Sequence, residues 1–201
     1  MGDASVFDGC TEVKELTISG KGDMPNYRKG KTPWNNCNKT IETLTIGEKV
    51  ISIGSWAFCN FVNLKDDVTI PASVKSIQSG AFSGVSTQKD NPGIVIKTAQ
   101  GSQLNDIGTN AFSSANAVID LSESHDIKVV NNKVFHNMSK DVILPYSVQT
   151  IYKGAYKKKN KTAVLYIYVL EENYISVNGV LYTNIPNDRK WNLQQKNQII
   201  I

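Results

Sequence analysis

Residues 52–58 read SIGSWAF, and variants of this stretch return along the chain. In each copy an aliphatic residue, Ile53 in the first, precedes a small residue and an aromatic residue by the same offset. The later copies are SIQSGAF at 76–82, DIGTNAF at 106–112, VVNNKVF at 129–135 and TIYKGAY at 150–156. An offset kept over five copies indicates repeated units, and one unit of this size cannot bury its own apolar face. We therefore expect the units to stack into a solenoid with a continuous core.

A short alternating segment precedes each of the five copies, and two further segments, LTIS and LYIY, extend the column at its two ends. These segments are LTIS at 16–19, LTIG at 44–47, VTIP at 68–71, IVIK at 94–97, IDLS at 119–122, VILP at 142–145 and LYIY at 165–168. Apolar residues two apart, rich in Ile and Val, predict a short strand with one buried face. Stacking should place successive strands about 4.8 Å apart in a parallel sheet. In the alternative fold, an ordinary β-sandwich, the repeated pairs of a small and an aromatic residue would occur only by coincidence.

The copies differ in ways that predict where the coil is regular. Val134 replaces the small residue in the fourth copy, and Tyr156 replaces Phe in the fifth. We therefore expect looser packing around residues 125–140 and an end of the regular coil near residue 170. Phe82, in a middle copy, should be fully buried and should touch the coils on both sides.

Both ends of a solenoid need a cap, because the core is otherwise exposed there. At the amino end we expect Met24, Tyr27 and Trp34 to cover the first coil. At the other end, Asn178-Gly179 lies between alternating apolar residues and predicts a hairpin with a type I′ turn.

Composition limits the classes of function. The net charge of +4 over 201 residues is too small to indicate a nucleic-acid partner. Without a long apolar run, no transmembrane segment is expected, and the first ten residues do not resemble a signal peptide. We interpret the cluster of Lys153, Lys157, Lys158, Lys159 and Lys161 as a solvated loop rather than an anion site.

No motif indicates catalysis or a bound cofactor. The three cysteines, Cys10, Cys37 and Cys59, lack metal-ligand spacing, and they allow either one bridge plus a free thiol or three free thiols. Glu123 and His125 in ESHD at 123–126 are too few for a metal site and are interpreted as a solvated turn. We expect no metal, no cofactor and no enzymatic activity.

The repeats resemble a known family. VTIPASVKSIQSGAF at 68–82 is similar to the pattern L-x-x-I-x-I-P-x-x-V-x-x-I-G-x-x-A-F of BspA-like leucine-rich repeats, which occur in surface proteins of anaerobic bacteria and some protists. The segment from LTISGKGDMPNY to TPW at 16–34 resembles the opening stretch of these proteins, and NGVLYTN at 178–184 resembles a hairpin that interrupts or ends their arrays.

This resemblance implies a β-rich leucine-rich-repeat solenoid, with one short parallel strand per repeat, an irregular N-terminal cap and a C-terminal β-hairpin. We expect one continuous domain, with the cap and first irregular repeat at 1–40, regular repeats at 41–170, and the hairpin or cap at 171–201. The resemblance further implies an extracellular or cell-surface protein that binds proteins in adhesion, with a host or bacterial surface protein as partner. The alternative is a structural spacer, or a truncated array, without its own ligand. The oligomeric state stays open.

The middle residue of each strand should point away from the core, because side chains alternate faces along a strand. Stacking then predicts one exposed column of Thr17, Thr45, Thr69, Val95, Asp120, Ile143 and Tyr166. The candidate partner-binding face is the second half of this column, formed by Val95, Asp120, Ile143 and Tyr166. Tyr166 is the expected anchor, and Lys153 is expected at the charged rim. The alternative is that these apolar residues only reflect the preference of strands for β-branched and aromatic side chains.

Overall fold

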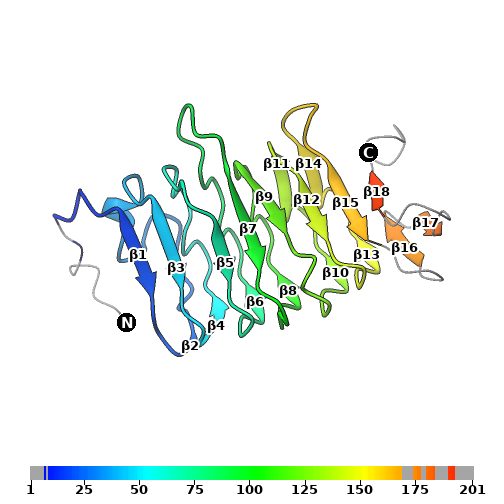
Figure 1. Ribbon diagram of the computed structural model, residues 1–201, viewed down its shortest axis with the longest axis horizontal. Helices are drawn as coiled ribbons and strands as arrows, with labels where there is room; N and C mark the ends of the chain where they lie inside the picture. The colour runs from blue at the N-terminus through cyan, green and yellow to red at the C-terminus, as the bar shows by residue number, and fades with distance from the viewer. Residues whose placement is uncertain (1–6, 8, 169–173, 178–179, 184–189, 193–201) are drawn as a thin grey trace.

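The computed structural model describes residue 7, residues 9–168 and the segments 174–177, 180–183 and 190–192. Strands of successive repeats stand side by side, so that the chain winds as a coil (Figure 1). The largest sheet, called the front sheet here, has six strands in the order β18-β15-β12-β9-β7-β5. These strands are β5 (Val68–Ile70), β7 (Ile94–Thr98), β9 (Ala117–Asp120), β12 (Val142–Leu144), β15 (Leu165–Tyr168) and β18 (Lys190–Asn192). β1 (Glu15–Ile18) and β3 (Thr43–Ile46) form a parallel pair that continues the same row (Figure 1).

Shorter strands form a second side of the coil. One sheet joins β2 (Gly22–Asp23), β4 (Val50–Ile53), β6 (Ser76–Ile77) and β8 (Asp106–Ile107). A second sheet joins β10 (Val129–Val130), β13 (Thr150–Ile151), β16 (Tyr174–Val177) and β17 (Val180–Thr183). Each aliphatic residue that leads a repeat motif, such as Ile53 or Ile77, lies at the end of one of these strands and is buried. The fold is therefore the expected β-rich solenoid.

A ladder of aromatic rings forms the centre of the core. Phe82 has no exposed surface, and its ring centroid lies 5.3 Å from that of Phe58 and 5.5 Å from that of Phe112. Phe112 stacks in turn on Phe135 at 5.7 Å. The buried Ala57, Ala81 and Ala111 that precede these rings leave room for them within each coil. The expected burial of Phe82 between two coils is confirmed.

The third side of each coil is built from a backbone corner that recurs with the motif. The residue before the small-aromatic pair always has a positive φ, and the five are Trp56 (58°), Gly80 (68°), Asn110 (60°), Lys133 (61°) and Gly154 (76°). Because L-residues other than Asn rarely adopt this conformation, the surrounding structure must enforce it at Trp56 and Lys133. Hydrogen bonds to the next repeat do so, as in Phe58 N–H to the Ala81 carbonyl at 2.8 Å. The motif at this position therefore depends on the backbone conformation of Trp56 and not on the size of its side chain.

Packing stays tight through residues 125–140, so the expectation of a looser coil there is wrong. Val134 and Phe135 are fully buried. The third side becomes a strand pair at this point, because β11 (Phe135–Met138) pairs in parallel with β14 (Tyr156–Lys158), with a shift of register between His136 and Met138. Val134, which is larger than the alanine of the earlier copies, is buried in the core next to Phe135. The predicted loop of lysines is in part a strand, because Lys157 and Lys158 lie in β14, whereas Lys153, Lys159 and Lys161 lie in turns or bends.

The amino-terminal cap packs as expected. The Trp34 indole is 7% exposed, stacks on Phe58 at 6.2 Å and donates its Nε1–H to the Ala57 carbonyl at 2.7 Å. Tyr27 packs edge-on against Trp34 at 5.5 Å, and Met24 is a partly buried neighbour of the core. Both rings therefore close the open end of the aromatic ladder.

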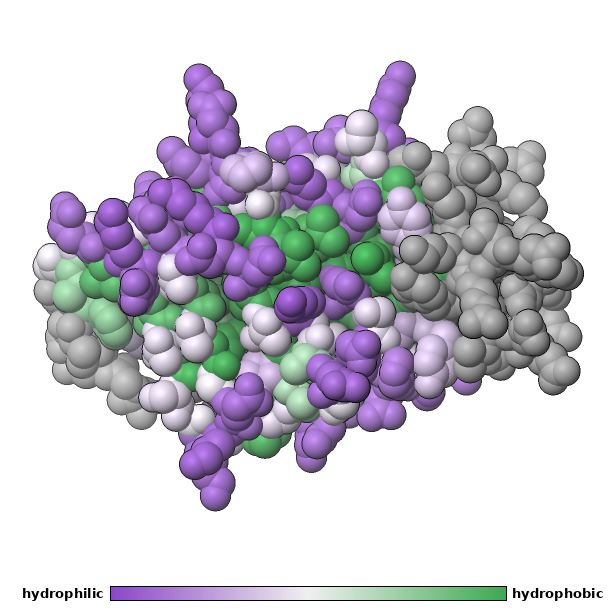
Figure 2. Space-filling view, viewed as in Figure 1, coloured by the Kyte–Doolittle hydropathy of each residue, from purple (hydrophilic) through white to green (hydrophobic). Residues whose placement is uncertain are grey.

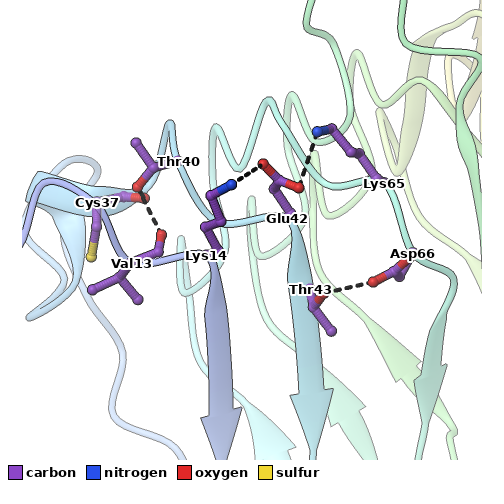
Figure 3. A network of polar contacts seen from close by, with 8 residues as sticks. All are labelled: Val13, Lys14, Cys37, Thr40, Glu42, Thr43, Lys65 and Asp66. Atoms are coloured by element: carbon purple, nitrogen blue, oxygen red, sulfur yellow. Dashed lines mark hydrogen bonds and ion pairs between the residues drawn. The ribbon is translucent and has the colours of Figure 1, made fainter.

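Polar contacts hold the strands together at the same end of the coil. Glu42 lies between Lys14 and Lys65, with oxygen–nitrogen distances of 3.6 and 3.0 Å (Figure 3). The hydrogen bond from Lys65, together with the charges of both lysines, lowers the pKa of Glu42 below its ordinary value. The Thr43 hydroxyl donates to Asp66 at 2.6 Å. Each of these contacts joins neighbouring repeats.

The regular parallel order ends near residue 170, as expected. β18 pairs antiparallel to β15, and β17 pairs antiparallel to β16. The β16–β17 pair confirms the hairpin, with Val177 opposite Val180. The turn residues Asn178 and Gly179 lie outside the described residues, so the turn type stays a prediction. All three cysteines are free, which decides between the two alternatives for them.

Candidate binding surface

The outward positions of the front sheet form a continuous column. The register pairs Thr17 with Thr45 in the first strands, and Thr69 with Lys97 further along. It then pairs Lys97 with Asp120, Asp120 with Ile143, and Ile143 with Tyr166. The three threonines and Lys97 are exposed, whereas Asp120, Ile143 and Tyr166 are half-buried. The structure therefore brings together Asp120, Ile143 and Tyr166 as predicted.

Val95 does not lie in this column, which corrects the prediction. Val95 pairs with Val118 instead, one outward position nearer the start of the strands. Its column position is taken by Lys97, because β7 is longer than its neighbours and is shifted by two residues. The signal was present in the sequence: Lys97 precedes Ile107 by the same number of residues as Asp120 precedes Val130.

The shift of β7 also places a hydroxyl in the core. Thr98 pairs with Ile70 and is 5% exposed, at a position where other repeats carry an aliphatic residue. The Ser124 hydroxyl donates to the Thr98 hydroxyl at 3.1 Å, so neither group is left without a hydrogen bond. Because a buried hydroxyl is costly only when it has no partner, the core tolerates the shifted register.

Half-buried apolar side chains gather beside the column. Val95 and Val118 are cross-strand neighbours, and Ile143 lies on the next strand. Figure 2 shows hydrophobic surface over β7, β9 and β12 with hydrophilic side chains around it. We call Val95, Val118 and Ile143 the apolar patch. It borders Lys97 and Asp120, whose opposite charges are also cross-strand neighbours.

Lys153 does not lie at the rim of this surface. It lies two residues after the end of β13, and its carbonyl accepts a hydrogen bond from the Asn132 side chain at 3.0 Å. β13 belongs to a different sheet from β15, which carries Tyr166. The coil therefore places Lys153 away from Tyr166, at the corner where the third side begins.

A polar pocket adjoins the starts of the front-sheet strands. Its volume is about 330 Å³, and it is lined by Asn116, Val118, Ser139, Lys140, Asp141, Asn160 and Thr162. Hydrogen bonds between repeats hold the walls: Ser139 Oγ donates to Asn116 Oδ1 at 3.0 Å, and the Asn160 amide donates to the Ser139 carbonyl at 3.1 Å. The Asp141 carboxylate accepts the Val164 N–H at 2.8 Å. This pocket was not expected from the sequence, because its residues come together only when three repeats stack.

The repeats match a known family along most of the chain. The sequence pattern described as "BspA type Leucine rich repeat region" matches in six copies, over residues 3–86 and 30–163. The chain belongs to the BspA-type leucine-rich repeat family.

A solved structure of similar fold agrees with this assignment. The crystal structure of a leucine-rich repeat protein from Eubacterium ventriosum, at 2.50 Å resolution, is 28% identical in sequence to this BspA-type chain and superposes with a TM-score of 0.60. The match covers 86% of this chain and 44% of the Eubacterium protein, so this chain spans less than half the length of that relative. No curated protein matches this sequence.

The described part of this BspA-type chain shows no assembled metal centre. Within it, no three His, Cys, Asp or Glu side chains lie close enough to hold a metal ion. His125 packs against Tyr146 with ring centroids 4.7 Å apart, in an exposed turn. Burial raises the pKa of the Cys37 and Cys59 thiols, which keeps them protonated and unreactive at neutral pH. No helix in the described ranges is long and apolar enough to cross a membrane.

Proposed function

We propose that this chain is a non-enzymatic protein-binding module, secreted or displayed at a cell surface, which acts in adhesion through the outer face of its front sheet. The observation that carries the proposal is the apolar patch of Val95, Val118 and Ile143, bordered by Lys97 and Asp120. Repeat proteins use such extended sheet surfaces for binding. Membership of the BspA-type family, whose members include surface proteins, supports the proposed location.

The composition of the face suits a protein partner. Protein interfaces combine a small apolar centre with a polar rim, and their binding energy concentrates in a few central side chains. The apolar patch supplies a centre, and Tyr166 stands beside Ile143 as an aromatic anchor. Lys97 and Asp120 would orient a partner of complementary charge more than they would add affinity.

The face is also rigid, which lowers the cost of binding. Its side chains are carried by strands that are hydrogen-bonded on both sides, as β9 is to β7 and β12. A partner therefore meets a surface that is already in its binding shape, and little conformational entropy is lost on association.

The test is a double substitution, Ile143→Ser with Tyr166→Ser, in the intact chain. Binding to a panel of purified extracellular-matrix proteins would be measured by surface plasmon resonance for the wild type and the variant. We expect at least one matrix protein to bind the wild type, and its affinity to fall about tenfold or more in the variant, as for the loss of two central contacts. The matched control is Thr45→Ala with Thr69→Ala, in the same column but away from the apolar patch, and it should bind like the wild type.

Two results would count against the proposal. Unchanged affinity of the Ile143/Tyr166 variant, with an unchanged melting temperature, would move the binding site away from the front sheet. Absence of binding to every protein of the panel would favour the structural-spacer alternative. Antibody labelling of intact producing cells would test the proposed surface location separately.

A further inference from the structure

Positive charge is concentrated in one part of the chain. Residues 128–161 contain one acidic residue, Asp141, and eight lysines, at 128, 133, 140, 153, 157, 158, 159 and 161. Because the whole chain has a net charge of only +4, the remainder is net negative. The mild overall charge therefore hides a strong local excess.

The fold gathers most of this charge on the third side of two adjacent repeats. β11 and β14 pair in parallel, with His136 opposite Lys157. The Lys133 N–H donates to the Gly154 carbonyl at 3.0 Å, which brings Lys133 beside the segment that contains Lys153. The Lys159 N–H donates to the Met138 carbonyl at 2.6 Å. We call Lys133, His136, Lys153, Lys157 and Lys159 the basic side; the four lysines are exposed and His136 is half-buried.

These lysines lack acidic partners within the described part of the chain. The ion pairs found there both involve Glu42, at the opposite end of the coil. The carboxylate of Asp141, the one acid within residues 128–161, accepts a backbone N–H. Ammonium groups gathered on one side of the coil repel one another, and a bound anion would relieve that repulsion.

We propose that the basic side binds a linear anionic polysaccharide through its carboxylate or sulfate groups. Lys157 stands on the β11–β14 strand pair, and backbone hydrogen bonds tie Lys133 and Lys159 to the neighbouring repeat, so the backbone spacing is held while each ammonium group can adjust. Lysine suits this ligand because its ammonium group is a point charge with three rotatable donors and needs no fixed planar partner. Tyr152, 55% exposed and next to Lys153, offers an aromatic face for the C–H groups of a sugar ring.

Other polyanions fit the surface less well. A protein interface has a centre depleted of charge, whereas the basic side consists of charged residues around one tyrosine. Single-stranded nucleic acid is bound by successive aromatic stacking platforms, and duplex DNA by an element that enters a groove. The short β11–β14 strand pair near the exposed Tyr152 provides neither. The basic side also lies away from the front-sheet face, so this inference does not depend on the proposed protein partner.

The test compares two charge-matched variants of the intact chain. In the first, Lys133, Lys153, Lys157 and Lys159 are replaced by Gln. In the second, the same replacement is made at four exposed lysines of the amino-terminal half, Lys21, Lys31, Lys49 and Lys75. Binding to immobilised heparin, hyaluronan, neutral dextran and a DNA duplex would be measured at several salt concentrations. Melting temperatures would establish that all variants are folded.

We expect the wild type to bind heparin or hyaluronan but not dextran, with an affinity that falls as salt rises because bound counterions are released. The basic-side variant should bind about tenfold more weakly or worse, and the amino-terminal variant should stay within about threefold of the wild type. Replacing the four basic-side lysines by Arg should retain binding. Binding to heparin but not to hyaluronan would show that the basic side recognises sulfate groups. Binding to both would show that either a carboxylate or a sulfate group is sufficient.

Three outcomes would overturn the inference. The wild type fails to bind either polysaccharide at low salt. Both Gln variants lose affinity equally, which would show that net charge and not the basic side is responsible. DNA binds more tightly than heparin with the same dependence on the basic-side lysines, which would assign the surface to nucleic acid.

Discussion

Replacing Phe82 by Ala should destabilise the solenoid strongly, because this ring links two coils. Phe82 has no exposed surface and lies between the rings of Phe58 and Phe112. A buried phenylalanine removes about 150–250 Å² from water, which at about 25 cal/mol per Å² amounts to about 4–6 kcal/mol. Alanine keeps part of this area, and measured Phe→Ala losses in cores are about 3–5 kcal/mol. We therefore expect the free energy of unfolding to fall by about 3–5 kcal/mol.

The assay is thermal and urea denaturation followed by circular dichroism. For a chain of this length, a loss of 3–5 kcal/mol corresponds to a drop in melting temperature of about 6–20 °C. The exposed Tyr152→Ala should change the stability by about 0.5 kcal/mol or less and serves as the control. A double-mutant cycle with Phe112→Ala should give a coupling of about 0.5–1.5 kcal/mol, as expected for rings in contact. A melting temperature for Phe82→Ala within about 2 °C of the wild type would refute the ring ladder.

Two further substitutions test the third side. Gly80 has a φ of +68°, and a new Cβ there would collide with the Trp56 indole, so Gly80→Ala should lower the free energy of unfolding by about 2–3 kcal/mol. The control is Gly101→Ala, because Gly101 has a φ of +72° and nothing near its Cβ. This control should lose only the conformational part, about 1–2 kcal/mol. Equal losses in urea denaturation would contradict the indole contact. Tyr156→Phe removes a buried hydroxyl without a hydrogen-bond partner and should raise the stability by about 1 kcal/mol. Burial, and then the charge of Asp141, raise the pKa of Tyr156, so the unfolded chain ionises first and the wild type should lose stability as the pH rises above about 10. The Tyr156→Phe variant should lose less stability over the same pH range. If the melting temperatures of both proteins fell by the same amount between pH 8 and pH 10.5, the proposed role of the Tyr156 hydroxyl would be contradicted.

The repeat architecture could be read from local patterns alone. The Ala81-Phe82 pair and its copies recur at a fixed offset from a leading aliphatic residue, and a period of this kind has few solutions other than stacked coils. The cap residues followed from the same reasoning, since an open aromatic ladder needs a cover, and Trp34 supplies it. These features depend on which residues are apolar and how far apart they are, and both are properties of the sequence.

Register and the grouping of polar side chains depended on the tertiary structure. Val95 and Lys97 both fit the alternation of β7, and only the pairing with β5 and β9 decides which of them enters the column. A shift by two residues keeps the same face buried, so the periodicity does not distinguish the two registers. The hydrogen bond between Thr98 and Ser124 makes the observed register acceptable, and it joins side chains from different repeats.

The exposed lysines show that the grouping of surface side chains also depended on the tertiary structure. In the sequence, Lys133 and Lys153 are separated by a whole repeat, and the run from Lys157 to Lys159 is typical of a loop. Stacking brings these residues together at and beside the β11–β14 strand pair, and it moves Lys153 away from Tyr166 to a different side of the coil. The sequence determines what each repeat buries, because burial follows from local alternation. The tertiary structure decides which exposed side chains become neighbours, because that depends on loop lengths and strand register across repeats.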